Sequence, residues 1–157
     1  MLSQLQKLGR DVEGRYATDE ELQFLQDYSS SYSLRLQTYQ RLHELEATIV
    51  QQTYDRLRSR EPGIFLSGTA DVSAKWKRDT IRVLRYSAIA LLLNDPETLR
   101  ERLLYWMQTI MRAFSAQHSC HLTYEVMQAV VKQHLTPPEA SLFCPILEVN
   151  RQLLGVV

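Results

Sequence analysis

The sequence predicts an all-α protein that folds as one domain. Its 157 residues suit a single domain of ordinary size. Glycine and proline occur only five times each, whereas leucine, glutamine, arginine and glutamate, which favour helices, are frequent. Helix-start and helix-stop patterns recur along the chain. They bound stretches in which apolar residues return every three or four positions, the spacing of an amphipathic helix.

The first two predicted helices form an N-terminal hairpin. Leucines at every third position predict a helix over residues 2–10, which one of the following glycines ends. Thr18 followed by Glu21 has the spacing of a capping box and predicts a second helix that runs to about Tyr28. A turn is predicted next, at a group of serines: Ser29, Ser30, Ser31 and Ser33. Serine hydroxyls compete for backbone groups and so favour helix ends.

The middle of the chain predicts two long helical stretches. The first covers residues 33–60, either as one kinked helix or as two helices in line, and Glu61-Pro62-Gly63 ends it. Residues 64–71 are predicted to be a loop. The second stretch covers residues 72–93 and stops at Asn94.

Three more helices are predicted in the last third of the chain. Asp95 as an N-cap with Pro96 at the first helical position starts a helix that extends to about Ala116. A further helix covers residues 123–134, and a final one covers residues 137–154, capped by Thr136. Seven or eight helices in one domain of this size suit globin-like packing.

The composition excludes several classes of function. Lys plus Arg and Asp plus Glu both total 18, so no strong field favours nucleic acid as a partner. The apolar stretch around residues 88–93 is far shorter than the roughly 20 residues needed to span a bilayer. No secretory pattern opens the chain, so a cytoplasmic protein is predicted. A glycine-rich phosphate loop, a nucleophile motif and a carboxylate pair are all missing, and no enzyme activity is predicted.

The cysteines and histidines give little support for a metal or haem site. Cys120 and Cys144 lack metal-type spacing and are predicted to be ordinary buried or half-buried thiols, with an unusual thioether site as the alternative. His118, Cys120 and His121 cluster, but zinc requires four ligands and no others are evident. An axial haem role for His118 or His121 is the less favoured interpretation. No metal is predicted.

The run from Trp76 to Pro96 reads WKRDTIRVLRYSAIALLLNDP. It resembles the pigment-attachment helix of phycobiliproteins, the light-harvesting globins of cyanobacteria and red algae, in which C-x-R-D-x-x-x-x-L-R-Y precedes G/N-D-P. The matching residues are Arg78, Asp79, Leu84, Arg85, Tyr86, Asp95 and Pro96. Trp76 stands where the family has the cysteine that holds a linear tetrapyrrole. The resemblance therefore implies no covalent bilin at this position.

The resemblance also implies roles for the neighbours of Trp76. Asp79 would accept hydrogen bonds from pyrrole nitrogens, and Arg78 would pair with a propionate. Without the resemblance, Asp79 would simply pair with Lys75 and Arg82 on a solvated helix face. Trp76 itself either fills the space of a bilin or stacks against a tetrapyrrole that is bound non-covalently, and filling is the favoured alternative.

A second resemblance concerns the predicted hairpin. Residues 11–16, DVEGRY, are similar to the D-V-x-G-x-Y stretch that joins the first two helices of phycobiliprotein subunits. The resemblance implies that these helices project from the globin body and pack on a partner, with Asp11 and Tyr16 as contact residues. Asp11 would meet Arg85 and Tyr86 of that partner. A homodimer, or a heterodimer with a phycobiliprotein-like subunit, is therefore predicted.

Two further segments extend the resemblance over most of the chain. DPETLRERLL, from Asp95 to Leu104, matches D-P-x-x-L-x-E-R-x-L, and Pro138-Glu139-Ala140 is similar to the start of the family's final helix. The resemblance implies a single phycobiliprotein-like globin domain over residues 1–157, with the hairpin at 1–30 and the globin body at 33–157.

The function implied by the resemblance is a phycobilisome-related role in photosynthesis, played through protein contacts without a covalent bilin. The protein would be an antenna-associated subunit or an assembly or turnover factor, cytoplasmic or at the thylakoid surface through phycobilisomes. The alternative is a carrier or sensor that binds a tetrapyrrole, bilin or haem, non-covalently through Arg78 and Asp79. A third alternative, a stress-signalling globin relative with a hydrophobic ligand, has no residue to which it can be assigned.

Overall fold

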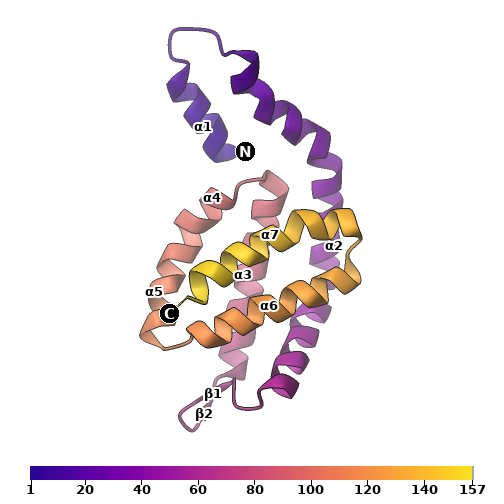
Figure 1. Cartoon of the computed structure of the whole chain (residues 1–157), viewed down its shortest axis with the longest axis vertical. Helices are drawn as coiled ribbons and strands as arrows, with labels where there is room; N and C mark the ends of the chain where they lie inside the picture. Colours follow the sequence, from indigo (N-terminus) through magenta and orange to yellow (C-terminus); the bar gives the residue numbers. More distant parts are fainter. Residues whose placement is uncertain (157) are drawn as a thin grey trace.

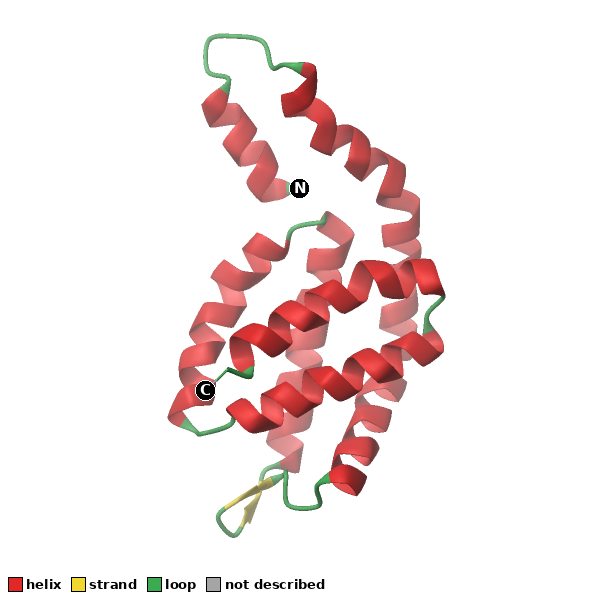
Figure 2. Cartoon of the chain, in the orientation of Figure 1, coloured by secondary structure: helices red, strands yellow, loops and turns green. Residues whose placement is uncertain are grey.

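The computed structural model describes residues 1–156 and is almost entirely helical (Figure 2), which confirms the predicted all-α class. Val157, which the predicted domain includes, lies outside the described residues. In chain order the elements are α1 (Leu2–Asp11), α2 (Asp19–Arg60), β1 (Leu66–Ser67), β2 (Ala70–Asp71), α3 (Ser73–Leu93), α4 (Pro96–Leu99), the π-helical turn η1 (Arg100–Leu104), α5 (Tyr105–Ala113), α6 (Gln117–His134) and α7 (Pro137–Leu154). The two strands form a small antiparallel hairpin within the segment predicted to be a loop.

The long helix α2 begins as predicted but runs without a break for 42 residues. At its start the Thr18 hydroxyl accepts from the Glu21 amide (3.3 Å), and the Glu21 carboxylate accepts from the Thr18 amide (2.9 Å). The predicted turn at the serines is wrong. The hydroxyls of Ser30 and Ser31 donate to carbonyls one turn earlier in the same helix, at 3.0 and 3.2 Å, so they are satisfied without ending it.

The junction between α3 and α4 has the predicted caps. Asn94, with a φ of 47°, ends α3 in the left-handed conformation. The Asp95 carboxylate then accepts from the amide of Thr98 (3.2 Å), and Pro96 takes the first helical position.

The helix that follows passes through η1, where the amide of Tyr105 donates to the carbonyl of Arg100 five residues earlier. Such a turn changes the face that later side chains present. The predicted apolar stripe is wrong at Trp106, which is 58% exposed, and at Phe114, which follows the end of α5 and is 63% exposed, whereas Met107 of the same stripe is buried.

Helix α6 begins at Gln117, six residues earlier than the predicted start at Thr123. Its first turns contain polar residues such as His118 and Ser119, which hide the apolar periodicity. Helix α7 begins as predicted, at Pro137 with a capping box between Thr136 and Glu139.

The helices form a body from which an N-terminal hairpin projects (Figure 1). Helices α6 and α7 lie side by side in front of α3, with the later part of α2 beside them. The largest fully buried side chains lie in this body and include Phe143, Leu147, Met127, Leu91 and Ile49. Helix α1 has no buried residue and, with the first turns of α2, extends beyond the body. None of the described helices is long and apolar enough to cross a membrane.

Candidate functional site

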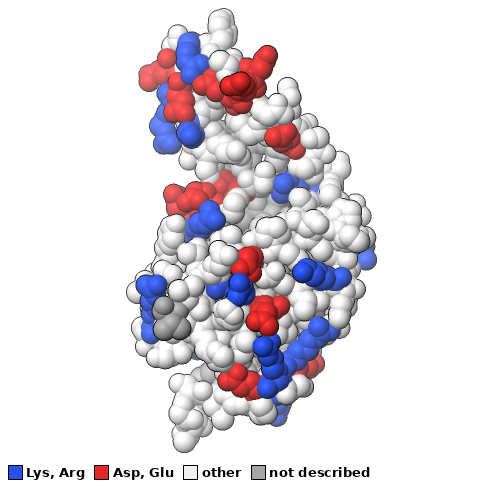
Figure 3. Space-filling view, in the orientation of Figure 1, with Lys and Arg blue, Asp and Glu red and all other residues white. Residues whose placement is uncertain are grey.

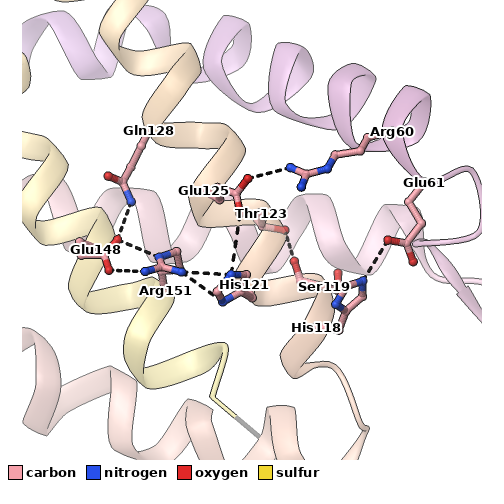
Figure 4. A network of polar contacts seen from close by, with 10 residues as sticks. All are labelled: Arg60, Glu61, His118, Ser119, His121, Thr123, Glu125, Gln128, Glu148 and Arg151. Atoms are coloured by element: carbon pink, nitrogen blue, oxygen red, sulfur yellow. Dashed lines mark hydrogen bonds and ion pairs between the residues drawn. The ribbon is translucent and has the colours of Figure 1, made fainter.

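Trp76 is the central residue of the candidate site. It lies half-buried on α3, and its indole N–H donates to the hydroxyl of Thr123 on α6 at 2.9 Å. The Thr123 hydroxyl in turn donates to the carbonyl of Ser119 at 2.7 Å (Figure 4). The indole is therefore fixed between two helices that are far apart in the sequence.

Two other aromatic rings pack against this indole. Phe65 meets it edge-on with ring centres 5.1 Å apart, and Tyr54 is tilted against it at 5.9 Å. Tyr54 and Phe65 also stack on each other at 4.7 Å. Each such pair contributes about 0.5–1.5 kcal/mol beyond the area that it buries. The cluster gives Trp76 a structural role that links α2, α3 and α6.

A cavity of about 190 Å³ lies beside Trp76, between α3, α5, α6 and the start of the β-hairpin. Trp76 and Asp79 line it, whereas Arg78 is exposed and does not. The structure thus brings two of the three bilin-pocket-like residues together around one space.

The carboxylate of Asp79 is half-buried at the wall of this cavity. Within residues 1–156 it has no hydrogen bond or ion pair, so the surface pairs with Lys75 and Arg82 are not formed. The ammonium group of Lys75 instead lies 4.2 Å from the centre of the Phe114 ring, at the same cavity. The carboxylate of Asp79 therefore has no partner within the described residues, and its oxygens are open to solvent or to a ligand.

Helix α6 adds two polar groups that the sequence analysis did not assign to the site, Cys120 and Tyr124. Burial, aided by the negative charge of Asp79, raises the pKa of the Cys120 thiol to about 12. Burial, with smaller effects of Cys120 and Asp79, also raises the pKa of Tyr124 well above its usual value. Both groups are neutral at physiological pH, and Cys120 is a weak nucleophile. Their spacing on α6 shows that they share a face, but only the fold reveals that this face meets Trp76.

The predicted subunit-contact residues lie in two places. Asp11 is exposed at the end of α1, and Tyr16, in the loop that follows, is 98% exposed. Tyr86, on α3, is 45% exposed. Arg85 precedes it and makes a bidentate ion pair with Glu46 of α2, with both N–O distances at 2.7 Å. Hydrogen bonds from Arg85 lower the pKa of Glu46. Asp11 and Tyr16 therefore lie on the hairpin, whereas Arg85 and Tyr86 lie on the body.

Polar contacts attach the hairpin to the end of α3. The buried Asp95 carboxylate accepts from the amide of Ser3 (2.9 Å) and from its hydroxyl, in addition to capping α4. Tyr28 donates to the carbonyl of Leu92 at 2.9 Å, and Arg35 donates to that of Leu91 at 2.8 Å. Burial alone would raise the pKa of Asp95, but hydrogen bonds from Ser3 and Thr98 outweigh it and bring the pKa to about 2.

His118 and His121 belong to polar contacts at the surface of the body. His118 pairs with Glu61 at 2.9 Å, while His121 lies 3.0 Å from Arg151 and 3.8 Å from Glu125 (Figure 4). This network joins the end of α2 to α6 and α7. Across residues 1–156, no three His, Cys, Asp or Glu side chains are grouped so that they could hold a metal ion.

Comparisons with known proteins bear on these elements. The model of a family described as "Phycobilisome protein" matches residues 8–154. The phycobiliprotein beta chain of Mastigocladus laminosus is 26% identical to this chain over 130 residues, which are 80% of this chain and 77% of that protein. The range matched by the family model contains the loop after α1, all the cavity-lining residues and the Arg85–Glu46 pair.

Proposed function

The chain belongs to the phycobilisome protein family, and on this premise we propose that it acts without a covalent bilin, through contacts with other proteins. A phycobilisome-related role follows from the family. The finer role is that of an antenna-associated subunit or an assembly or turnover factor at the thylakoid surface, without catalytic activity. The observation that carries it is the indole of Trp76, hydrogen-bonded to Thr123 and packed against Phe65 at the attachment position.

The space beside Trp76 supports this proposal. The cavity measures about 190 Å³. Pockets for drug-sized ligands have volumes of about 300–1,000 Å³, and a linear tetrapyrrole with four rings belongs to that size class. Trp76 leaves too little room for such a molecule to be enclosed, which favours filling over stacking.

The hairpin supports a role in protein contacts. Leu2 and Leu5 on α1 are 45% and 40% exposed, and Tyr16 is almost fully exposed. On the face drawn in Figure 3, charged side chains of both signs lie at this end of the molecule. An amphipathic helix that leaves its apolar edge open gains free energy when a second surface covers it. A second copy of the chain, or a phycobiliprotein-like subunit, is the proposed partner.

The pigment part of the proposal is tested by producing the protein in cells that synthesise bilins and measuring visible absorbance and zinc-enhanced fluorescence of the denatured chain. The natural protein should be colourless. The variant Trp76→Cys supplies a thiol and opens space, and it is expected to gain covalent pigment. Trp76→Ser opens similar space without a thiol and serves as the control. Covalent pigment on Cys120 or Cys144 of the natural protein, located by mass spectrometry, would overturn the proposal.

The contact part is tested by sedimentation of the protein alone and with phycobiliprotein subunits. A dimer or a mixed complex is expected. Leu5→Glu should weaken it at least tenfold, because a charge would be buried at the contact. Gln6→Glu adds the same charge at the neighbouring exposed position and should have little effect. A chain that stays monomeric at high concentration and ignores such subunits would refute this part.

The unused carboxylate of Asp79 favours a second candidate, a carrier or sensor that binds bilin or haem non-covalently. Titration with free bilin and with haem, followed by visible absorbance, distinguishes the two functions. A tight spectral shift that disappears in Asp79→Ala would favour the carrier. Unchanged spectra would leave the contact role as the better account.

A further inference from the structure

The cavity beside Trp76 has the size of a small aromatic molecule. Its volume is about 190 Å³. An apolar protein cavity of about 150 Å³ is known to bind benzene, whereas larger ligands need about 300 Å³ or more. One ring, or two fused rings, therefore fits the space that a tetrapyrrole exceeds.

The walls of the cavity suit a flat apolar ring. Trp76, Phe65 and Phe114 supply aromatic surface, and Met107 and Met111 on α5 supply flexible thioethers. Aromatic rings attract each other edge-on or offset, and methionine sulfur packs well against ring edges.

Two polar groups in the cavity have hydrogen-bonding capacity to spare. Tyr124 is only 3% exposed, and its hydroxyl has no hydrogen bond within the described part of the chain. The Asp79 carboxylate accepts none there either. Both groups line the cavity, so a ligand that enters it can form hydrogen bonds with them.

The charges that face the cavity define the chemistry of the ligand further. Asp79 and Lys75 are the charged residues among those that line it, and their charges cancel. Lys75 lies against Phe114 and would repel a cation. A neutral molecule that donates one hydrogen bond matches Asp79 without meeting that repulsion.

We propose that this cavity binds a small neutral aromatic molecule with one O–H or N–H donor, of the size of phenol or indole. The donor is directed to Asp79, and the ring lies between Trp76 and the methionines of α5. This binding site goes beyond the proposed contact role and does not depend on it.

The experiment uses the full chain with ¹³C-methyl methionine and follows the methyl signals by NMR while phenol or anisole is added. Anisole is the methyl ether of phenol and cannot donate. Phenol should shift the signals of Met107 and Met111 with a dissociation constant on the order of 1 mM, as expected for so small a ligand. Anisole should bind about tenfold more weakly, since it lacks one hydrogen bond to a charged group. Met127 is fully buried outside the cavity lining and should not respond.

Three variants make the test specific. Asp79→Asn should reduce the preference for phenol over anisole to less than about threefold, because the acceptor loses its charge. Cys120→Met fills the cavity and should abolish binding of both molecules. Cys144→Met makes the same change at a thiol outside this cavity and should leave binding intact.

Several results would overturn the inference. They are the absence of shifts up to the solubility of phenol, equal shifts at Met127, equal affinity for phenol and anisole, or undiminished binding in Cys120→Met. None of them bears on pigment attachment or on association, so this inference and the proposed function fail separately.

Discussion

The body and the hairpin of this chain are held in place by different forces. In the body, Phe143, Met127 and Leu147 are fully buried, and apolar contacts dominate. In the hairpin, α1 buries no residue, and it is attached through Ser3 to the carboxylate of Asp95. The body contains the apolar core, although Trp106 and Phe114 on its surface are exposed, whereas the hairpin keeps its position by hydrogen bonds and leaves Leu2 and Leu5 exposed. The body therefore supplies most of the stability of the fold, and the proposed protein contact lies at the hairpin.

The largest expected effect comes from emptying the core of the body. Phe143→Ala should lower the free energy of unfolding by about 3–5 kcal/mol, because it removes a fully buried ring and leaves a cavity. Urea unfolding measures this change. Phe114→Ala is the matched control at a site 63% exposed and should cost less than about 1 kcal/mol. Similar losses in both variants would break the distinction between core and surface.

The next effect concerns Gly155, directly after α7, which lies close to the backbone of α6. A Cβ atom on Gly155 would lie 2.6 Å from the carbonyl oxygen of Arg151 and 2.8 Å from the Cα of His121. Gly155→Ala should therefore cost about 1–3 kcal/mol, since backbone atoms must move. Gly63→Ala meets no atom within 4 Å and serves as the control in the same urea series. An unchanged unfolding midpoint in Gly155→Ala would show that the neighbouring backbone atoms move at little cost in free energy.

A smaller effect separates the hairpin from the body. Asp95→Ala removes the cap of α4 together with the anchor of α1, and it should cost about 0.5–2 kcal/mol. Hydrogen exchange of the α1 amides should accelerate, while that of α7 keeps most of its protection. Asp27→Ala removes an exposed carboxylate of α2 and should leave exchange in α1 unchanged. Equal acceleration in α1 and α7 would argue against a separate attachment.

Acid should loosen the same attachment. The pKa of Asp95 is held at about 2, below the value of about 4 expected in an unfolded chain. A carboxyl whose pKa is lowered on folding adds stability above the unfolded value and loses it as pH falls through the folded value. Exchange in α1, relative to α7, should therefore rise between about pH 4 and about pH 2. Asp95→Asn, which has no such carboxyl, should be flat in this window, and a parallel rise in that variant would contradict the assignment.

The smallest expected effect is that of the Arg85–Glu46 pair. The Arg85 side chain is 68% exposed, so a double-mutant cycle with Ala should give a coupling of about 0.2–1 kcal/mol. A partner carboxylate that recruits Arg85 must compete with Glu46. Glu46→Gln should accordingly strengthen association with an acidic partner while barely changing stability. Weaker association in this variant would show that Glu46 itself belongs to the interface.

Much of the fold followed from local patterns in the sequence. The capping boxes at Thr18 and Thr136 and the pair Asp95-Pro96 predicted three helix starts, because each pattern satisfies amides within a few residues. The serine turn failed, since Ser30 and Ser31 can also bond one turn back inside a helix. No such local pattern marks the π-helical turn before Tyr105. The apolar periodicity therefore predicts Trp106 on the apolar face, whereas it is exposed.

The candidate site was less accessible to sequence analysis. The pattern around Trp76 identified one wall of it, on α3. The other wall is formed by Thr123, Cys120 and Tyr124, more than 40 residues later. Local sequence patterns do not predict which helices pack against each other. These residues can therefore be assigned to the site only when the packing of the helices is known.

The indole of Trp76, held between α3 and α6, gives the protein an internal fluorescent reporter. The chain contains two tryptophans. Trp76 is half-buried beside Tyr54, whereas Trp106 is exposed on α5. Their ultraviolet emission should therefore differ in wavelength and in accessibility to a quencher, so that opening of the body and covering of its surface give distinct signals without any added dye. The position that resembles a pigment anchor thus carries a fluorophore of its own.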